Sequence, residues 1–346
     1  MKNNPLISII IAFYNEEDFL DRCLHSVSSQ TYNRFEVILI NDGSTDFSLK
    51  IAKEYADSFF KANLITIQNS GHAEARNIGL ENCTGDYVTF LDADDLLEPN
   101  MIEVFIEDIK SFKADIAICD ISVYSEDGKI SYNSNWNGEL SKKESTNELI
   151  NQMYCGGISE NVWAKVFRTN LAKQIVFEKG LWFDDRPFLL EYLHLSETAS
   201  FVNKKLLKIY RRNSSITRRE LEPKRIVDAY RVFELELDIS KKYNNLNDYK
   251  NKIGKFTLNV FMDTYIMQII DEKRIIDIDI VRKTFLKYLV RFKKEIEVQN
   301  INMKLKDKIA LQLIILPRLL GWNFTNLAFY FLKGKRINAI KRLKNQ

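Results

Sequence analysis

The first hundred residues alternate short apolar runs with segments of helical periodicity, and this alternation constrains the fold more than any other feature of the chain. The runs at 6–12, 35–40, 64–67 and 87–91 are apolar enough to be buried strands. Apolar strands that alternate with helices predict a parallel, doubly wound sheet. Because crossover connections are right-handed, the carboxyl ends of these strands meet at one edge, where open α/β sheets bind ligands.

Polar side chains follow these strands at the predicted edge of the sheet. Tyr14 stands just after the first strand, Asp42 ends the second in an Asp-Gly turn, and the sequence Asp-Ala-Asp-Asp at 92–95 ends the fourth. Three like charges at a strand end repel one another, and Mg²⁺ or Mn²⁺ would relieve that repulsion. The alternative is an acidic loop in which Asp94 or Asp95 caps the next helix.

The composition excludes several classes of protein. The chain has 346 residues, 45% of them hydrophobic and 28% charged, which is typical of a folded globular protein. Its four cysteines form no Cys-x-x-Cys pair, which favours a reducing compartment over a disulfide framework or a zinc site. The N-terminal segment has no signal-peptide pattern, so we expect a cytoplasmic protein. The chain has no glycine-rich phosphate loop, which disfavours a dinucleotide oxidoreductase or a nucleotidyltransferase.

The pattern of the sequence changes near residue 220. Residues 115–215 mix strand and helix signals, without an internal repeat. Beyond them, three segments have the spacing of long helices, at 225–243, 250–270 and 278–298. We therefore expect an α/β domain at 1–220 and a helical C-terminal domain at 221–346.

The C-terminal segment is strongly basic. From Ile301 onward the chain carries ten Lys and Arg residues against one acidic residue, whereas the remainder carries 40 basic and 46 acidic residues and a net charge of −6. Such asymmetry suggests an anionic partner. Residues 309–332 are mostly apolar but are interrupted at Pro317, so neither half reaches the roughly 20 residues that span a bilayer. Their aromatic and basic residues fit an interfacial segment on anionic lipid. The alternative is a helical bundle or dimer interface, and no motif supports nucleic acid.

Several turns at strand ends, taken together, resemble the inverting family 2 glycosyltransferases of the GT-A fold, over about residues 1–217. The matching segments are Pro-Leu-Ile-Ser-Ile-Ile-Ile at 5–11, Asn-Asp-Gly-Ser-Thr-Asp at 41–46, Asn-Ser-Gly at 69–71, Ala-Arg-Asn-Ile-Gly at 75–79, Phe-Leu-Asp-Ala-Asp-Asp at 90–95, Trp-Ala-Lys at 163–165 and Phe-Asp-Asp at 183–185. The resemblance implies a GT-A domain, that is, a doubly wound, Rossmann-like mixed sheet, followed by a helical appendage.

The resemblance also implies a donor site. Its nucleotide-sugar contacts would be Ala12, Tyr14, Asp42, Arg76, Asp92, Ala93 and Arg212. Tyr14 would stack on the base, and Asp42 would accept the uracil N3–H, which favours a UDP-sugar. Arg76 would supply positive charge to the base pocket or the diphosphate, and Asp92 would hold the ribose or the metal. The structural alternatives are a turn role for Asp42, a solvated Arg76 on a helix surface and a surface connector around Arg212.

The same resemblance assigns different roles to the remaining carboxylates. Asp94 would bind Mn²⁺ or Mg²⁺, which stabilises charge on the UDP leaving group. Asp185 would be the general base that deprotonates the acceptor hydroxyl, and the single displacement would invert the anomeric configuration. The neighbouring Asp184 stands where the family more commonly has Glu. Alternatively, both aspartates cap a helix that starts at Pro187.

These assignments predict a metal-dependent enzyme that moves a hexose or N-acetylhexosamine from a UDP-sugar to a hydroxyl of a saccharide, expected to be lipid-linked, in the synthesis of a surface polysaccharide such as capsule or O-antigen. Trp163 is expected beside the sugar or acceptor pocket, and Lys165 is expected to reach an anionic group; the alternative is a strand with a core Trp and a solvated Lys. The tail would bring the protein to the inner face of the cell membrane, and homo-oligomerisation stays open. The alternatives are a silent nucleotide-sugar-binding or scaffold protein and a nucleotidyltransferase.

Overall fold

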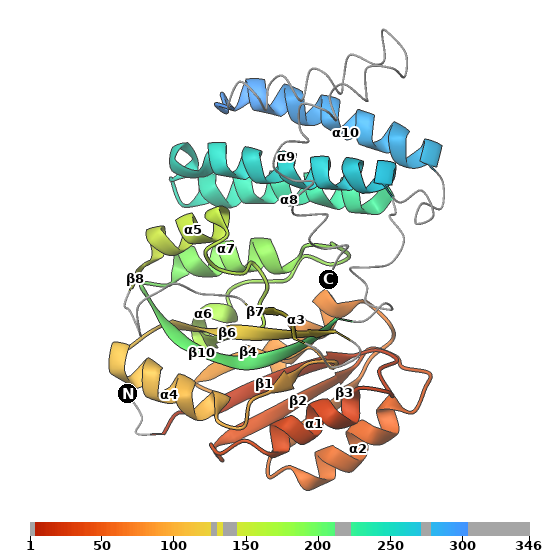
Figure 1. Cartoon of the computed structure of the whole chain (residues 1–346). Coiled ribbons are helices and arrows are strands. Elements are labelled where there is room, and N and C mark those ends of the chain that lie inside the picture. Colours follow the sequence, from red (N-terminus) through yellow and green to blue (C-terminus); the bar gives the residue numbers. More distant parts are fainter. Residues whose placement is uncertain (1–3, 126–129, 134–143, 212–222, 271–277, 304–346) are drawn as a thin grey trace. The chain divides into compact units, whose positions relative to one another are not determined.

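The computed structural model describes five stretches of the chain, residues 4–125, 130–133, 144–211, 223–270 and 278–303 (Figure 1). The chain divides into two compact units, residues 1–212 and 213–346. The predicted domain boundary between 220 and 221 and the predicted interfacial segment at 309–332 both lie outside the described residues.

One mixed sheet organises the N-terminal unit. Its described strands are β1 (Ile7–Phe13), β2 (Phe35–Asn41), β3 (Ala62–Thr66), β4 (Tyr87–Phe90), β5 (Leu96–Leu97), β6 (Ile116–Ser125), β7 (Ile130–Asn133), β8 (Glu144–Ser145), β9 (Lys165–Arg168) and β10 (Thr198–Arg211). They follow the order β3-β2-β1-β4-β9-β6-β10-β5, with β7 paired to β6 and β8 to β10. The pairs β1–β2, β1–β4 and β2–β3 are all parallel, as predicted. Strand β9 runs antiparallel to β4 and to β6. The predicted mixed α/β sheet is therefore confirmed.

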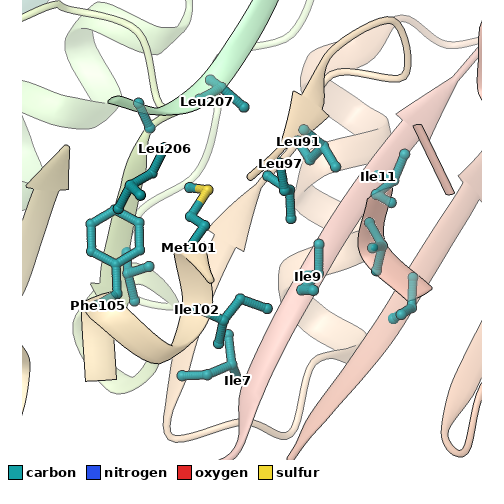
Figure 2. Close-up of a cluster of buried hydrophobic side chains, with 14 of the residues drawn as sticks. Ile7, Ile9, Ile11, Leu91, Leu97, Met101, Ile102, Phe105, Leu206 and Leu207 are labelled. Carbon is teal, nitrogen blue, oxygen red and sulfur yellow. The ribbon is translucent and has the colours of Figure 1, made fainter. Parts of the chain in front are cut away.

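Helices cover both faces of this sheet. The described helices of the unit are α1 (Leu20–Ser28), α2 (Ser48–Ser58), α3 (His72–Asn82), α4 (Met101–Phe112), α5 (Thr146–Cys155), α6 (Thr169–Ala172) and α7 (Asp185–Leu195). Because side chains alternate across a strand, the isoleucines at odd positions of β1 share one face of the sheet. Figure 2 shows Ile7, Ile9 and Ile11 in one cluster with Met101 and Phe105 of α4. The buried residues of α1 belong to the same cluster.

The opposite face carries α3 and an aromatic cluster. Helix α3 approaches β1 so closely that a Cβ on Gly79 would lie 2.5 Å from Cγ2 of Ile10. The rings of Phe177 and Phe188 stack with centroids 4.0 Å apart, and Phe90 of β4 packs edge-on against Phe177 at 5.4 Å. Glycine at position 79 thus lets α3, which carries Arg76 and His72, lie directly on the sheet.

The segment 161–168 has the sequence pattern of a strand, but its extended part is shorter than that pattern. Only Lys165–Arg168 is extended, as β9. Ala164 adopts a φ of 56°, which interrupts the extended backbone before β9 begins. Residues 159–164 form a loop instead, and this loop proves to be part of the candidate site.

Helices α8 (Pro223–Lys242), α9 (Leu246–Ile270) and α10 (Ile278–Val298) form the described part of the C-terminal unit, as the sequence predicts. Aromatic side chains fill its core: the ring of Phe292 lies 5.0 Å from Phe233 and 5.4 Å from Phe261. Among the residues that the structure describes, no helix is both long enough and apolar enough to cross a membrane.

Candidate active site

The turns after β1, β2 and β4 begin at one edge of the sheet. The Asp42 N–H donates to the Phe13 carbonyl at 2.9 Å, and the Leu91 N–H donates to the Ile10 carbonyl at 3.0 Å. Both bonds continue the parallel pairing with β1 beyond the strand ends. The polar turns predicted to form the site therefore start side by side.

Ala12, Tyr14 and Asp42 lie on the side of this edge predicted to bind the nucleotide. Ala12 is half-buried in β1, and Tyr14 exposes 46% of its surface, which leaves its ring accessible for stacking. Asp42 is buried, and its carboxylate accepts the backbone N–H groups of Ser70 at 2.7 Å and Gly71 at 2.9 Å. Asp42 therefore holds the loop before α3 through these two hydrogen bonds. This contact is additional to any role of Asp42 in the Asp-Gly turn. Its contact with uracil stays a prediction.

The acidic turn after β4 is held by its neighbours. An Nη2 N–H of Arg22 donates to the Asp94 carbonyl at 3.0 Å, and the Tyr210 N–H donates to Oδ1 of Asp95 at 3.3 Å. Helix α4 follows the N-cap residue Asn100, whose side chain makes no capping bond. The alternative in which Asp94 or Asp95 caps this helix is therefore wrong. Both aspartates belong to a turn that is fixed against α1 and β10.

Asp92 and Asp94 fit a metal that binds together with a diphosphate. The Asp92 side chain is 41% exposed, and Asp94 is half-buried, with Ala93 buried between them. Carboxylate oxygens are the ligands that Mg²⁺ and Mn²⁺ prefer. Among the described residues no group of three His, Cys, Asp or Glu side chains could hold a metal ion. A cation bound at this turn would therefore need oxygen ligands in addition to these two carboxylates.

Arg76 of α3 connects this turn to a second acidic pair. Its Nη2 lies 3.0 Å from Oδ1 of Asp92, and its Nη1 lies 2.5 Å from Oδ1 of Asp185 and 3.7 Å from Oδ2 of Asp184. Only 8% of Arg76 is exposed, so the alternative of a solvated Arg is wrong. Burial alone would lower the pKa of Arg76, but the negative charges of the three carboxylates have the larger combined effect and raise it.

Asp184 and Asp185 stand at the start of α7, three and two residues before Pro187. Helix α7 begins at Asp185, and the Asp184 side chain makes no capping bond. Oδ2 of Asp185 accepts the Val162 N–H at 3.2 Å, while Oδ1 faces Arg76. Asp184 therefore occupies the N-cap position, but the helix starts before Pro187, Asp185 is its first residue, and the Asp184 side chain does not cap it.

Burial raises the pKa of Asp185 to about 6; the charge of Arg76 opposes this shift, and the charge of Asp184 reinforces it. A carboxylate with this pKa is ionised at neutral pH but accepts a proton more readily than an exposed aspartate does. Its chemistry suits a general base, although the role itself stays a prediction.

His72 is a member of this cluster that the sequence did not identify. Its Nε2 lies 2.7 Å from Oδ1 of Asp184. Burial works against protonation, but the hydrogen bond and the charge of Asp184 outweigh it and raise the pKa of His72. The two residues are 112 positions apart, so no local spacing indicates the contact. The one available signal is that His72 directly follows the Asn-Ser-Gly segment at 69–71.

Lys165 is buried, which contradicts only the solvated alternative; its predicted reach toward an anionic group of the sugar or acceptor stays a prediction. Only 1% of it is exposed, and its Nζ donates to the Asn161 carbonyl at 2.7 Å. Burial lowers the pKa of Lys165 to about 8, against the opposing charge of Asp185. Lys165 is therefore not solvated, and its Nζ donates to the backbone carbonyl oxygens of Asn161 and Trp163. Trp163 packs, partly buried, against the core cluster of Figure 2, as its structural alternative predicts.

A second buried cation holds the same loop. Arg186 is 1% exposed, and its Nη1 lies 2.5 Å from Oε2 of Glu160. Together with Lys165 it fixes the loop at 159–164, whose Val162 N–H binds Asp185. These two cations therefore act on the conformation of the loop that orients the candidate base.

The last predicted donor contact, Arg212, lies outside the described residues and stays a prediction. A cavity of about 500 Å³ lies at the amino end of β4, lined by residues that include Gly85, Lys110 and Arg168. It contains none of the predicted site residues, so the charged cluster at the carboxyl edge is the candidate site.

Comparisons with known proteins identify the family and the fold of the chain. Residues 8–165 match the model of the family described as "Glycosyl transferase family 2". "Uncharacterized glycosyltransferase YibD" of Escherichia coli is 31% identical over 264 residues, which are 73% of this chain and 74% of YibD. "Glycosyltransferase GlyA" of Streptococcus pneumoniae is 31% identical over 218 residues, which are 61% of this chain and 31% of GlyA. The structure of S. aureus TarS 1–349 in complex with UDP-GlcNAc superposes with a TM-score of 0.69 at 18% identity, over 91% of this chain and 92% of TarS 1–349.

Proposed function

The chain belongs to glycosyltransferase family 2 and has the GT-A fold, and on this premise we propose that it transfers a hexose or N-acetylhexosamine from a UDP-sugar to a hydroxyl group of a saccharide, with inversion at the anomeric carbon. Family membership makes the chain a glycosyltransferase enzyme, and the donor, the metal and the stereochemistry are the content of the proposal. The accessible ring of Tyr14 and the position of Asp42 support a uridine nucleotide, as does the UDP-GlcNAc bound by the structurally similar TarS.

In the proposed reaction the acceptor hydroxyl oxygen attacks the anomeric carbon from the face opposite UDP. The bond between the anomeric carbon and the diphosphate oxygen breaks, UDP leaves, and Asp185 takes the proton of the acceptor hydroxyl. The pKa of about 6 for Asp185 supports this role, because the group is ionised at neutral pH and still binds a proton well. A single displacement converts an α-linked donor into a β-linked product.

The contact of Arg76 with both Asp92 and Asp185 is the observation that carries the proposal. One guanidinium connects the side chain proposed for the donor ribose to the proposed base. The proposed donor anchor and the proposed base thus belong to one cluster of charges, as a displacement on a bound sugar requires. Arg76 would also offer positive charge to the diphosphate.

Asp94 is proposed to hold Mn²⁺ or Mg²⁺ together with oxygens of the donor diphosphate. When bound, such a cation supplies Lewis-acid stabilisation of the negative charge on UDP. Ala12, Ala93 and Arg212 would complete the donor site.

The proposed acceptor is a lipid-linked saccharide at the cytoplasmic face of the cell membrane, used in the synthesis of a surface polysaccharide. The basic, aromatic-rich composition from Ile301 to the C-terminus supports this setting, since such segments bind anionic lipid surfaces.

A panel of UDP-hexoses and UDP-N-acetylhexosamines, scored by UDP release with and without Mn²⁺, tests the proposal. We expect one class of donor to release UDP, and chelation of the metal to suppress the release. Absence of UDP binding at millimolar nucleotide would contradict the proposal. A nucleotidyltransferase would instead form pyrophosphate from a nucleoside triphosphate and a sugar phosphate, and a silent binding protein would bind UDP without turnover.

A further inference from the structure

His72 and Asp184 form a contact that the proposed reaction does not use. Nε2 of His72 lies 2.7 Å from Oδ1 of Asp184; the carboxylate side chain is 2% exposed, whereas the imidazole is 45% exposed. A buried carboxylate without a counter-charge is costly. The imidazole therefore stabilises Asp184, because it gives the carboxylate a hydrogen bond and, when protonated, a counter-charge.

The second oxygen of Asp184 explains why this contact matters to the base. Among the described residues, Oδ2 of Asp184 has no hydrogen-bond partner, and it lies 3.7 Å from Nη1 of Arg76. The same Nη1 lies 2.5 Å from Oδ1 of Asp185. Asp184 and Asp185 are thus adjacent carboxylates that face the same nitrogen of one guanidinium.

We infer that His72 is a positioning residue of the base: by neutralising Asp184, it leaves Arg76 committed to Asp185 and Asp92. This inference rests on the proposed role of Asp185 as the general base. Without His72, the uncompensated charge of Asp184 would draw Arg76 away from Asp185. Asp185 would then lose its cation and face a second negative charge, and both changes favour its protonated form.

The loop before α3 holds His72 in place for this role. Asp42 accepts the N–H groups of Ser70 and Gly71, and Gly71 has a φ of 87°, which favours glycine. His72 follows directly as the first residue of α3. The charged groups that face its imidazole are Asp184, Arg76 and Asp185. The carboxylate proposed to bind the nucleotide base therefore also fixes the backbone that carries His72.

NMR of the histidine side chains in the full-length protein tests the contact without any substrate. The chain has three histidines, and loss of one signal in His72→Gln assigns the relevant resonance. We expect His72 to titrate above the ordinary value of about 6.5, and to return toward that value in Asp184→Asn. Titration of His72 at the same pH in the wild type and in Asp184→Asn would overturn the inference.

Kinetics of His72→Leu and His72→Gln test the consequence for the base. Leu removes the hydrogen bond, so we expect turnover to fall about 10- to 100-fold, as for loss of a hydrogen bond to a charged group, and the acid limb of kcat/KM to move to higher pH. Gln keeps an N–H donor without a charge, so we expect it to restore most of the turnover at high pH. His25→Gln, at an exposed position of α1, is the matched control and should behave as the wild type does.

The outcomes separate this inference from the proposed function. If Asp185→Asn abolishes transfer but His72→Leu has wild-type turnover and pH dependence, the inference fails and the proposed base stands. If Asp185→Asn keeps transferring sugar, the proposed function of Asp185 fails whatever the His72 variants do. Equal losses in His72→Leu and His72→Gln, with no change in the acid limb, would indicate a merely structural residue and overturn the inference.

Discussion

Arg76 has one positive charge to share among Asp92, Asp184 and Asp185, and it is nearly buried. His72 adds a second charge only when it is protonated. The carboxylates therefore outnumber the cations in the absence of donor and metal, and a divalent cation that binds with the diphosphate would restore the balance. The fold keeps these charged groups close together because they come from α3, the start of α7 and the turn after β4, each of which is fixed to the sheet.

Replacement of Arg76 by Met is expected to destabilise the protein. The substitution leaves Asp184 and Asp185 without their guanidinium partner in a buried setting, which typically costs about 3–5 kcal/mol. Urea unfolding followed by circular dichroism measures this loss. Lys179→Met is the matched control, because the Lys179 side chain is 64% exposed in its 2.8 Å pair with Glu74, and exposed pairs contribute less than about 1 kcal/mol. Similar losses in the two variants would contradict the buried cluster.

The pH dependence of the reaction is expected to follow Asp185. A general base acts in its deprotonated form, and burial raises the pKa of Asp185 to about 6. Activity should therefore be full well above pH 6 and decline as the pH falls through about 6 and the carboxylate is protonated. A kcat/KM profile on the best UDP-sugar donor measures this limb. A profile that stays flat down to pH 5 would show that no group with a raised pKa is the base.

At the scale of elements, the approach of α3 to β1 places His72 and Arg76. Gly79→Ala would place a Cβ 2.5 Å from Cγ2 of Ile10, so we expect α3 to shift. Overpacking should lower the free energy of unfolding by about 1–3 kcal/mol. This loss exceeds the gain in helix propensity, which is at most about 1 kcal/mol. Thermal or urea unfolding measures the loss, and turnover should fall as Arg76 moves. The double variant Gly79→Ala/Ile10→Ala provides room, so its loss should be smaller than the sum of the two single losses. Additive losses would argue against this close packing.

The loop at 159–164 is the second element that the site requires. Lys165→Met removes the donor to the Asn161 carbonyl and leaves that oxygen unsatisfied, which typically costs about 1–3 kcal/mol. Because the Val162 N–H that binds Asp185 lies on the same loop, we expect turnover to fall as well. Paired measurements of urea stability and kcat test this. Lys173→Met is the control: its Nζ also donates to a carbonyl, that of Cys83 at 2.8 Å, but at the opposite edge of the sheet, so turnover should stay unchanged.

At the scale of the whole molecule, the basic C-terminal composition predicts attraction to anionic membranes. The full chain should sediment with vesicles that contain anionic phospholipid and should remain in solution with neutral phosphatidylcholine vesicles. Added salt should weaken the binding, because the attraction is screened within about 10 Å at 0.1 M ionic strength. Equal binding to both kinds of vesicle, or none to either, would contradict an electrostatic membrane contact.

The sequence predicts the fold well because its parallel strands are continuous apolar runs, whose period and turns are local properties. The parallel pairing of β1 to β4 and the common edge of Tyr14, Asp42 and the turn at 92–95 follow from that pattern and from right-handed crossovers, whereas the order β3-β2-β1-β4 is known only from the structure. The contacts of Arg76, Lys165 and His72 could not be predicted in this way. Each depends on partners far away in sequence or on a loop carbonyl, and an isolated Arg, Lys or His has the same local signature on a helix surface as in a buried cluster.

The central claim is that Asp185 deprotonates the acceptor during transfer from a UDP-sugar. The most direct test compares wild type and Asp185→Asn in two measurements on the same preparation, UDP affinity by calorimetry and sugar transfer to acceptor. We predict that Asp185→Asn keeps the UDP affinity and loses transfer by about 10²- to 10⁴-fold, the usual contribution of a general base. Transfer at the wild-type rate by Asp185→Asn would contradict the account.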